Sequence, residues 1–293
     1  MGLATYFGRV LRWAVLIRPV CPRPDIRGLF SATAIGFTAV VIFGRPGEFV
    51  RPYLVSLKEK TPFSSQAAAW LLERIFDLLA ALLIFGFALA QIEGSGVHAG
   101  PTFAWVMKAG GWIAALLGSL CLVVLFLLGR YAESMQQRLL SALSALPATW
   151  HSKLRELVAA FVRGVESTQS PGLLLSILLY TALEWILIAA CYVSLFRAFP
   201  DLASFRIADI MVFLGFVSFG SIVQLPGIGG GMQLVAIVVL TELFGVSLEV
   251  ATGMALMLWI ITFVVIVPVG VIMLFHEGIN WQKLKEMEDR ASV

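Results

Sequence analysis

The chain has 293 residues, of which 59% are hydrophobic and 13% are charged. Because soluble domains carry about 25% charged residues, this composition excludes an ordinary soluble domain and predicts an all-α polytopic membrane protein. The net charge of +3 is small, so the positions of Lys and Arg serve as topology signals, and we expect no nucleic acid among the partners.

The chain opens with an apolar run, Leu3–Val20, that contains Arg9 and Arg12. We expect this run to be too short and too basic for a membrane span, and we expect no cleavable signal peptide. The proline-containing loop Pro19–Arg27 is rich in arginine and is predicted on the cytoplasmic side by the positive-inside rule.

Two short apolar arms follow, separated by a charged break. The first arm, Gly28–Phe43, is about 16 residues long, fewer than the roughly 20 needed to cross a bilayer, and it stops at Gly44–Gly47. The second arm, Glu48–Leu57, ends at the basic segment Lys58–Lys60. This pattern predicts a re-entrant hairpin that enters from the cytoplasm and returns there. The alternative is an amphipathic pair on the membrane surface.

The break places Arg45, Glu48 and Arg51 between apolar runs. An ionisable side chain inside a bilayer costs at least a few kcal/mol, so such residues usually face a protein interior or a water-filled cavity and mark a site. The alternative is that Arg45 and Arg51 flank a loop at the membrane surface, where basic residues are ordinary.

A full span is predicted at Gln66–Ile92, about 40 Å long, after a helix-start signal at Thr61–Ser65. It carries Glu73, Arg74 and Asp77. The two carboxylates lie four residues apart and share a face, and Arg74 is within pairing reach of Asp77. We expect these charges to face the hairpin; an Arg–carboxylate pair that locks two helices together is the structural alternative.

The middle of the chain alternates external and cytoplasmic segments. Glu93–Pro101 lacks Lys and Arg and is expected outside, and Phe103–Leu128 is a second full span. Arg130–Ser170 is cytoplasmic by charge, and its apolar spacing on both sides of Pro147 predicts two amphipathic helices. These helices either cover the inner membrane face or bind a partner.

Pro171–Phe196 is a third span and carries Glu184, which is either functional or bonded to a neighbouring helix. Arg197–Arg206 is then expected to be external. The last full span is Ser247–Phe275, and the basic tail His276–Val293 is predicted to be cytoplasmic.

A second interrupted segment lies between these spans. Ile207–Val223 and Met232–Phe244 are short apolar arms, and Gln224–Gly231 separates them. Irregular backbone cannot face lipid, so this tract must be buried in protein or line a cavity. We therefore predict a second re-entrant or broken-helix hairpin.

The whole chain is predicted to be one membrane domain with about four full spans and two hairpins, a pattern typical of an inverted repeat. The first half is 1–129, the amphipathic helices are 130–170, the second half is 171–275, and the tail is 276–293.

The two tips are expected to meet near the middle of the membrane. Helix N-termini there would favour a phosphate or carboxylate, three arginines would add bidentate hydrogen bonds, and three carboxylates would balance the arginines, take protons or contact an amine. The candidate substrate-binding residues are Arg45, Gly47, Glu48, Arg51, Glu73, Arg74, Asp77, Pro226, Gly227, Gly229, Gly230, Gly231 and Gln233.

The ordered motifs Arg45-x-Gly47-Glu48-x-x-Arg51, Glu73-Arg74-x-x-Asp77 and Pro226-Gly227-Ile-Gly229 resemble the lysylphosphatidylglycerol synthase transmembrane-domain family, described as flippase-like integral membrane proteins. The resemblance covers nearly the whole chain. It implies a multi-helix domain, in the plasma membrane of a prokaryote, that moves aminoacylated or glycosylated lipids between leaflets.

Three features qualify the resemblance. In aminoacyl-lipid members a separate cytosolic synthase domain makes the lipid, and the residues after Phe275 are too few for one. Family members often have a full helix before the first motif, whereas here we expect only the end of one, and whether the N-terminus is truncated is left open. Gln233 stands where a Glu commonly follows the glycines.

We therefore expect a lipid flippase or transporter that binds a phosphate-bearing head group of an anionic, aminoacylated or glycosylated lipid and needs no cofactor. The alternative is a non-catalytic subunit that scaffolds a lipid-synthesising or lipid-modifying enzyme through residues 130–170. An enzyme ranks third, because neither a metal cluster nor a nucleophile triad is visible, although Glu73 and Asp77 could serve a lipid hydrolase or transferase. A homo-oligomer is left open.

Overall fold

The apolar runs form helices, because a backbone within a membrane must satisfy its own hydrogen bonds. The computed structural model describes residues 2–94, 111–113, 115–127, 159–160, 162, 170–221, 224–225 and 229–278. Over these residues the regular structure is helical, except for one antiparallel pair of two-residue strands, β1 (Gln224–Leu225) and β2 (Gly229–Gly230). The predicted all-α membrane class is confirmed.

The elements fall into two halves. The first half contains α1 (Gly2–Leu16), α2 (Ile26–Phe43), the 3-10 helix η1 (Arg45–Phe49), α3 (Val50–Lys58) and α4 (Phe63–Gly94). The second half contains α7 (Pro171–Ala198), η3 (Pro200–Leu202), α8 (Ile207–Gly220), α9 (Gly231–Val238), the π-helical turn η4 (Val239–Leu243), α10 (Leu248–Thr262), η5 (Val264–Ile266) and α11 (Val267–His276). Most of the first predicted external loop (93–101), most of the amphipathic pair and most of the tail lie outside the described residues.

Three stretches within the described residues are long and apolar enough to cross a membrane: α2, α7 and the run from α10 to α11, Leu248–His276. The last two lie where the sequence predicts spans. α2 begins earlier than the predicted arm because the Asp25 carboxylate caps it, accepting hydrogen bonds from the backbone N–H groups of Arg27 and Gly28 at 3.1 and 3.0 Å. α4 contains 32 residues and is about 48 Å long.

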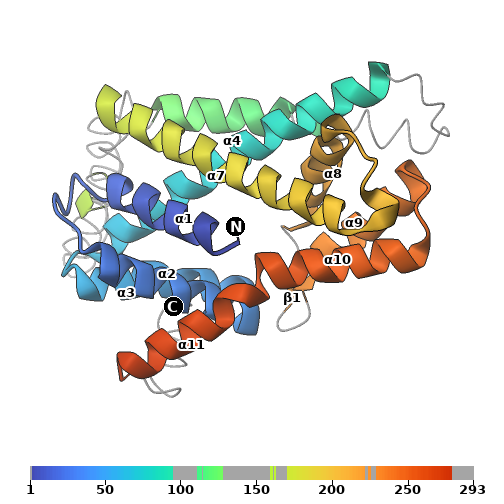
Figure 1. Cartoon of the computed structure of the whole chain (residues 1–293). Coiled ribbons are helices and arrows are strands. Elements are labelled where there is room, and N and C mark those ends of the chain that lie inside the picture. The colour runs from blue at the N-terminus through green and yellow to red at the C-terminus, as the bar shows by residue number, and fades with distance from the viewer. Residues whose placement is uncertain are drawn as a thin grey trace.

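The first hairpin, which consists of α2, η1 and α3, turns at a glycine break. Gly44 has a φ of 74°, a conformation that favours glycine. A Cβ on Gly47 would lie 2.4 Å from the carbonyl carbon of Ala39, so η1 packs directly on the backbone of α2. At the other end, the Asp25 backbone N–H donates to the Glu59 carboxylate at 3.1 Å. The hairpin therefore returns to the level where it began (Figure 1).

The second hairpin consists of α8, the β1–β2 turn, α9 and η4. Its arms lie close together at the tip: a Cβ on Gly220 would lie only 2.7 Å from the carbonyl oxygen of Gly231. Its open end is held by an edge contact between the rings of Phe205 and Phe244, whose centroids are 5.2 Å apart. Both interrupted segments of the sequence thus fold back on themselves.

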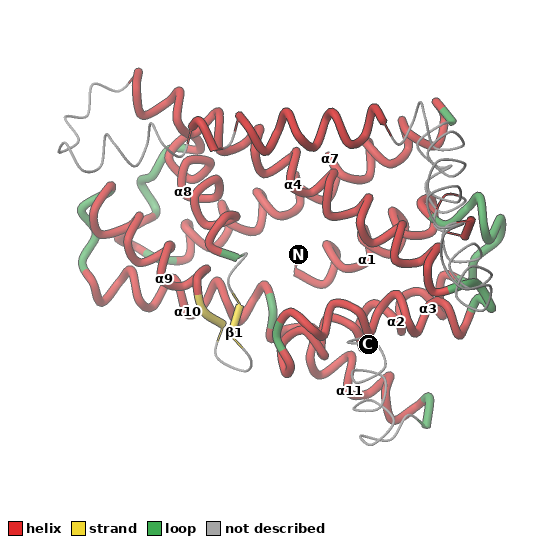
Figure 2. The backbone as a smooth tube through the Cα atoms, turned by 180° about the vertical axis from the view of Figure 1, so that it is seen from behind, coloured by secondary structure: helices red, strands yellow, loops and turns green. Residues whose placement is uncertain are grey.

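In each half, one helix packs against the hairpin of the other half. α4, which follows the first hairpin, packs along α8 of the second, whereas α11, near the end of the chain, packs along α2 of the first. The two helices that precede the hairpins, α1 and α7, pack against each other. Figures 1 and 2 show this arrangement from opposite sides.

The hairpins open toward opposite ends of the molecule. Lys58, at the end of α3, pairs with Glu277, which directly follows α11. α10 starts a few residues after Phe244, at the open end of the second hairpin. The candidate span Leu248–His276 therefore runs from the open end of the second hairpin to the open end of the first, as the orange and red helices in Figure 1 show.

Candidate functional site

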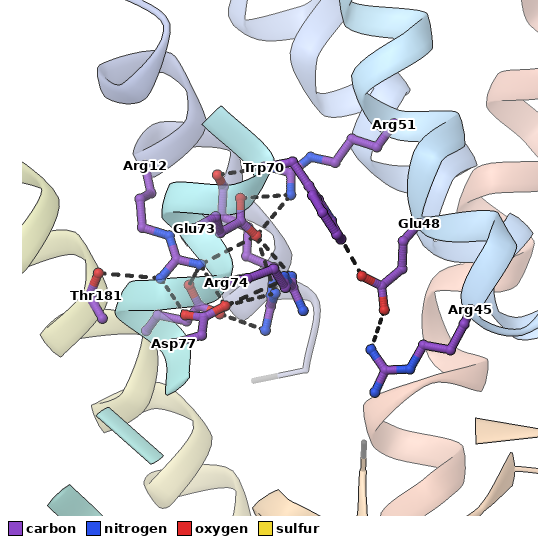
Figure 3. A network of polar contacts seen from close by, with 11 residues as sticks. Arg12, Arg45, Glu48, Arg51, Trp70, Glu73, Arg74, Asp77 and Thr181 are labelled. Carbon is purple, nitrogen blue, oxygen red and sulfur yellow. Dashed lines mark hydrogen bonds and ion pairs between the residues drawn. The ribbon is translucent and has the colours of Figure 1, made fainter. Parts of the chain in front are cut away.

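A buried ion-pair network lies between α1, α3, α4 and α7, and Glu73 of α4 is at its centre (Figure 3). The Glu73 side chain is fully buried. The guanidinium groups around its carboxylate are those of Arg51 at 3.1 Å, Arg74 at 3.2 Å, Arg12 at 3.3 Å and Arg9 at 3.5 Å. Glu73 is therefore shared among four arginines from three helices.

Asp77, one turn further along α4, binds Arg12 in a bidentate manner. The two guanidinium nitrogens of Arg12 donate to the two carboxylate oxygens at 2.6 and 3.0 Å, the geometry that gives arginine its strongest pairs. The same guanidinium donates to the hydroxyl of Thr181 on α7 at 3.3 Å. Arg74 lies 3.8 Å from Asp77, so the sequence-predicted pairing of these two residues is confirmed.

Glu184 of α7 completes the network. Its carboxylate lies 2.7 Å from Arg9 and 3.2 Å from Arg12, and its side chain is fully buried. The sequence left open whether Glu184 is functional or bonded to a neighbouring helix; it is bonded to α1. We call the seven residues Arg9, Arg12, Arg51, Glu73, Arg74, Asp77 and Glu184 the charged cluster.

Aromatic side chains position the guanidinium groups. Arg51 lies over the Trp13 ring at 4.0 Å, and Arg9 lies over the Phe37 ring at 5.1 Å, so the cluster gains cation–π attraction where water is excluded. Gly36 of α2 makes room for this arrangement, because a Cβ there would lie 2.6 Å from the Cβ of Arg51.

The charges of the cluster do not cancel. It contains four guanidinium groups and three carboxylates, which leaves an excess of one positive charge among the described residues. The side chains of Arg74, Arg9 and Asp77 are 33%, 17% and 15% exposed, whereas Arg12, Glu73 and Glu184 are fully buried. The cluster is therefore accessible along α4 and α1, at the side where Arg74 lies.

Arg45 and Glu48 lie beside the cluster as a separate pair (Figure 3). They form an ion pair with each other, and the Glu48 carboxylate accepts a hydrogen bond from the Trp70 indole at 3.3 Å. Arg45 also donates to the backbone carbonyl of Ser221, just after α8, at 2.9 Å. The tips of the two hairpins are thus in contact, and Arg45 makes that contact.

The tip of the second hairpin offers backbone groups to the site, because its described predicted residues are mostly glycines. Gly229 and Gly230 form β2, and Gly231 begins α9. The Gln233 side chain accepts a hydrogen bond from the Gly230 N–H at 2.7 Å, so this chain uses Gln233 to cap its own helix. Pro226 and Gly227, also predicted as site residues, lie outside the described residues.

Three residues of the cluster were not among the predicted site residues: Arg9, Arg12 and Glu184. Arg9 and Arg12 are three positions apart in an apolar run, which is the same signal that identified the charged residues of α4. Charge within an apolar run therefore marks Arg9 and Arg12 in the sequence as well, although the run Leu3–Val20 does not have the features of a span.

The fold and this cluster define a polytopic membrane protein with a charged site among its helices. The family model described as the lysylphosphatidylglycerol synthase TM region matches residues 1–270, so the chain belongs to this family, whose members are membrane proteins related to lipid handling. No curated protein and no solved structure matches the chain.

Proposed function

We propose that the protein moves a phosphate-bearing lipid between the membrane leaflets, with the head group at the charged cluster and the hydrocarbon tails in the bilayer. The lipid class is anionic, aminoacylated or glycosylated, in the plasma membrane of a prokaryote. The observation that carries the proposal is the excess guanidinium in a largely buried cluster, since an anionic partner would stabilise such a charge in a low-dielectric medium.

Arg74 is the arginine best placed to take the phosphate. It is the most exposed member of the cluster, at 33%, and both of its carboxylate partners have other arginines. When Arg74 turns toward a phosphate, Glu73 keeps Arg51 and Arg12 as partners, and Asp77 keeps Arg12. The exchange therefore leaves no buried carboxylate without a cation.

The hairpins supply a route from either side. They open toward opposite ends of the span Leu248–His276, and their tips touch through Arg45 and Ser221. Inverted repeats of this kind give alternating access when one half tilts against the other around a fixed site. Breaking the tip contact is the motion that would expose the cluster to the second leaflet.

A vesicle assay tests the proposal. Purified protein is placed in liposomes that contain a trace of fluorescent phosphatidylglycerol, and an impermeant quencher reports the labelled lipid in the outer leaflet, with and without an imposed proton gradient. We expect transport by the wild type and a loss of about tenfold or more in Arg74→Gln, because one charge-assisted phosphate contact contributes about 1.5–3 kcal/mol.

The matched control is Arg23→Gln, because Arg23 is an exposed arginine in the loop before α2 and lies outside the cluster. It should transport as the wild type does. If the wild type moves no fluorescent lipid under either condition while a known scramblase does so in matched vesicles, transport is excluded. Co-purification of a lipid-modifying enzyme would then favour the scaffold function.

A further inference from the structure

We infer that the lipid recognised at the charged cluster carries one net negative charge, as a phosphodiester head group without an amine does. This inference rests on the proposed function, and it specifies the substrate more narrowly than the family membership does. It follows from the number of charges in the cluster and from where the unpaired donors lie.

The charged cluster carries one positive charge in excess. Four guanidinium groups face three carboxylates at distances of 2.6 to 3.9 Å. Every carboxylate of the cluster is thus already compensated, and one positive charge remains. The neighbouring pair of Arg45 and Glu48 is neutral in itself and does not change this balance. A ligand with one negative charge makes the occupied site neutral.

Three buried hydrogen-bond donors of the cluster lack an acceptor in the part of the chain that the structure describes. The Nε atoms of Arg12, Arg51 and Arg74 are buried and have no hydrogen-bond partner among the described residues. A buried donor without a partner costs about 1–3 kcal/mol. Phosphate oxygens accept several hydrogen bonds at once, so an anion beside Arg74, the most exposed of the three arginines, would give its Nε an acceptor.

Lipid head groups differ in net charge. A phosphomonoester carries about −1.5 to −2 charge near neutral pH and would overcompensate the cluster. A zwitterionic head group would leave the excess charge in place. A lysyl ester of phosphatidylglycerol, with two ammonium groups against one phosphate, would add a further positive charge. Of these head groups, only a phosphodiester without an ammonium group, on a diacylglycerol or a polyprenol, matches the balance.

Native mass spectrometry of the full-length protein in detergent tests the ranking. The protein is mixed with equal amounts of phosphatidylglycerol, phosphatidic acid, phosphatidylethanolamine and lysyl-phosphatidylglycerol with the same acyl chains. We expect phosphatidylglycerol to be retained about tenfold or more over each of the other lipids. A tenfold ratio corresponds to about 1.4 kcal/mol, and an uncompensated charge in the membrane costs more than that. A polyprenyl-phosphate monosaccharide should compete equally if the head group alone is recognised.

Two variants change the balance in opposite directions. Arg74→Gln removes the excess charge, and the preference for phosphatidylglycerol over phosphatidylethanolamine should disappear, whereas Arg74→Lys should restore it. Asp77→Asn raises the excess to two charges, and the preference should shift toward phosphatidic acid. In the Asp77→Asn protein the buried Arg12 guanidinium still has carboxylate partners, because it keeps its contacts with Glu73 and Glu184. Arg23→Gln is again the control and should leave the ranking unchanged.

The outcomes separate this inference from the proposed function. Equal retention of phosphatidylethanolamine or lysyl-phosphatidylglycerol by the wild type overturns the inference, and so does a ranking that Arg74→Gln leaves intact. If vesicle transport occurs without the ranking, the proposed function stands and the inference falls. If the ranking is found without transport, the site binds the predicted lipid and the transport function falls.

Discussion

At the scale of single residues, Glu73 holds the cluster together. It contacts arginines of α1, α3 and α4, so one carboxylate compensates charge from three helices. A buried ion pair adds little net stability over an apolar packing, but removing one partner leaves an uncompensated charge that costs several kcal/mol. The cost of losing Glu73 should therefore exceed that of losing any single arginine near it.

We predict that Glu73→Gln lowers the free energy of unfolding by about 3–5 kcal/mol, because it leaves two excess positive charges in the membrane interior. Thermal unfolding of the protein in detergent, followed by tryptophan fluorescence, measures the change. The control is Glu48→Gln: its partner Arg45 is 42% exposed, and its loss should cost less than about 1 kcal/mol. The double variant Glu73→Gln with Arg51→Met restores the original excess and should recover part of the stability; equal losses in both single variants would contradict this account.

The partners of the cluster could not be read from the sequence, although most of its members could. Arg51, Glu73, Arg74 and Asp77 were found from charge in apolar runs. The pairing of Arg12 with Asp77 joins positions 65 residues apart, and its bond to Thr181 joins positions 169 residues apart. Such contacts depend on how the helices pack, and a periodic pattern along one helix carries no information about them.

At the scale of elements, glycines determine how closely the arms of the hairpins pack. Gly36, Gly47 and Gly220 each occupy a position where a Cβ would lie within 2.7 Å of a neighbouring atom. At Gly47 and Gly220 the nearest neighbour is backbone, which cannot move aside as a flexible side chain can. Close packing at Gly47 holds η1 against α2 and so places Arg45 and Glu48 at the tip.

Overpacking usually costs about 1–3 kcal/mol. We predict that Gly47→Ala lowers the free energy of unfolding by more than this usual cost, because the added Cβ would clash with the backbone of α2. Gly86→Ala on α4 is the matched control. Gly86 is exposed and has no atom within 4 Å of a Cβ placed there, so the change should be neutral or stabilising by up to about 1 kcal/mol. Similar thermal unfolding midpoints for the two variants would contradict this prediction, because they would show that η1 can move away from α2 at little cost.

The breaks in both hairpins were predictable because glycine and proline interrupt apolar helices in a recognisable way. α2 is longer than the predicted arm because Asp25 caps it ahead of Gly28. The β1–β2 pair was not predicted, since the pairing of Gln224 with Gly230 depends on the close approach of α8 and α9. Residues that interrupt a helix can therefore be recognised in the sequence, whereas the tertiary contacts at the tip of a hairpin cannot.

At the scale of the whole molecule, the direction of each hairpin follows from its contacts with the last helices. The pairing of Lys58 with Glu277 fixes the open end of the first hairpin beside the end of α11. The contact of Phe205 with Phe244 fixes the open end of the second hairpin beside the start of α10. If Leu248–His276 crosses the bilayer, the two hairpins must enter it from opposite faces.

Cysteine labelling tests this arrangement. In a background with the native cysteines replaced by Ser, single substitutions Lys60→Cys, His276→Cys and Asp201→Cys place thiols at three exposed positions. An impermeant maleimide applied to right-side-out vesicles should label Asp201→Cys, whereas Lys60→Cys and His276→Cys should react only after the cytoplasmic face is opened, because basic flanks remain inside. Labelling of Lys60→Cys and Asp201→Cys from one face would mean that the hairpins enter together, which would remove the inverted geometry on which alternating access depends.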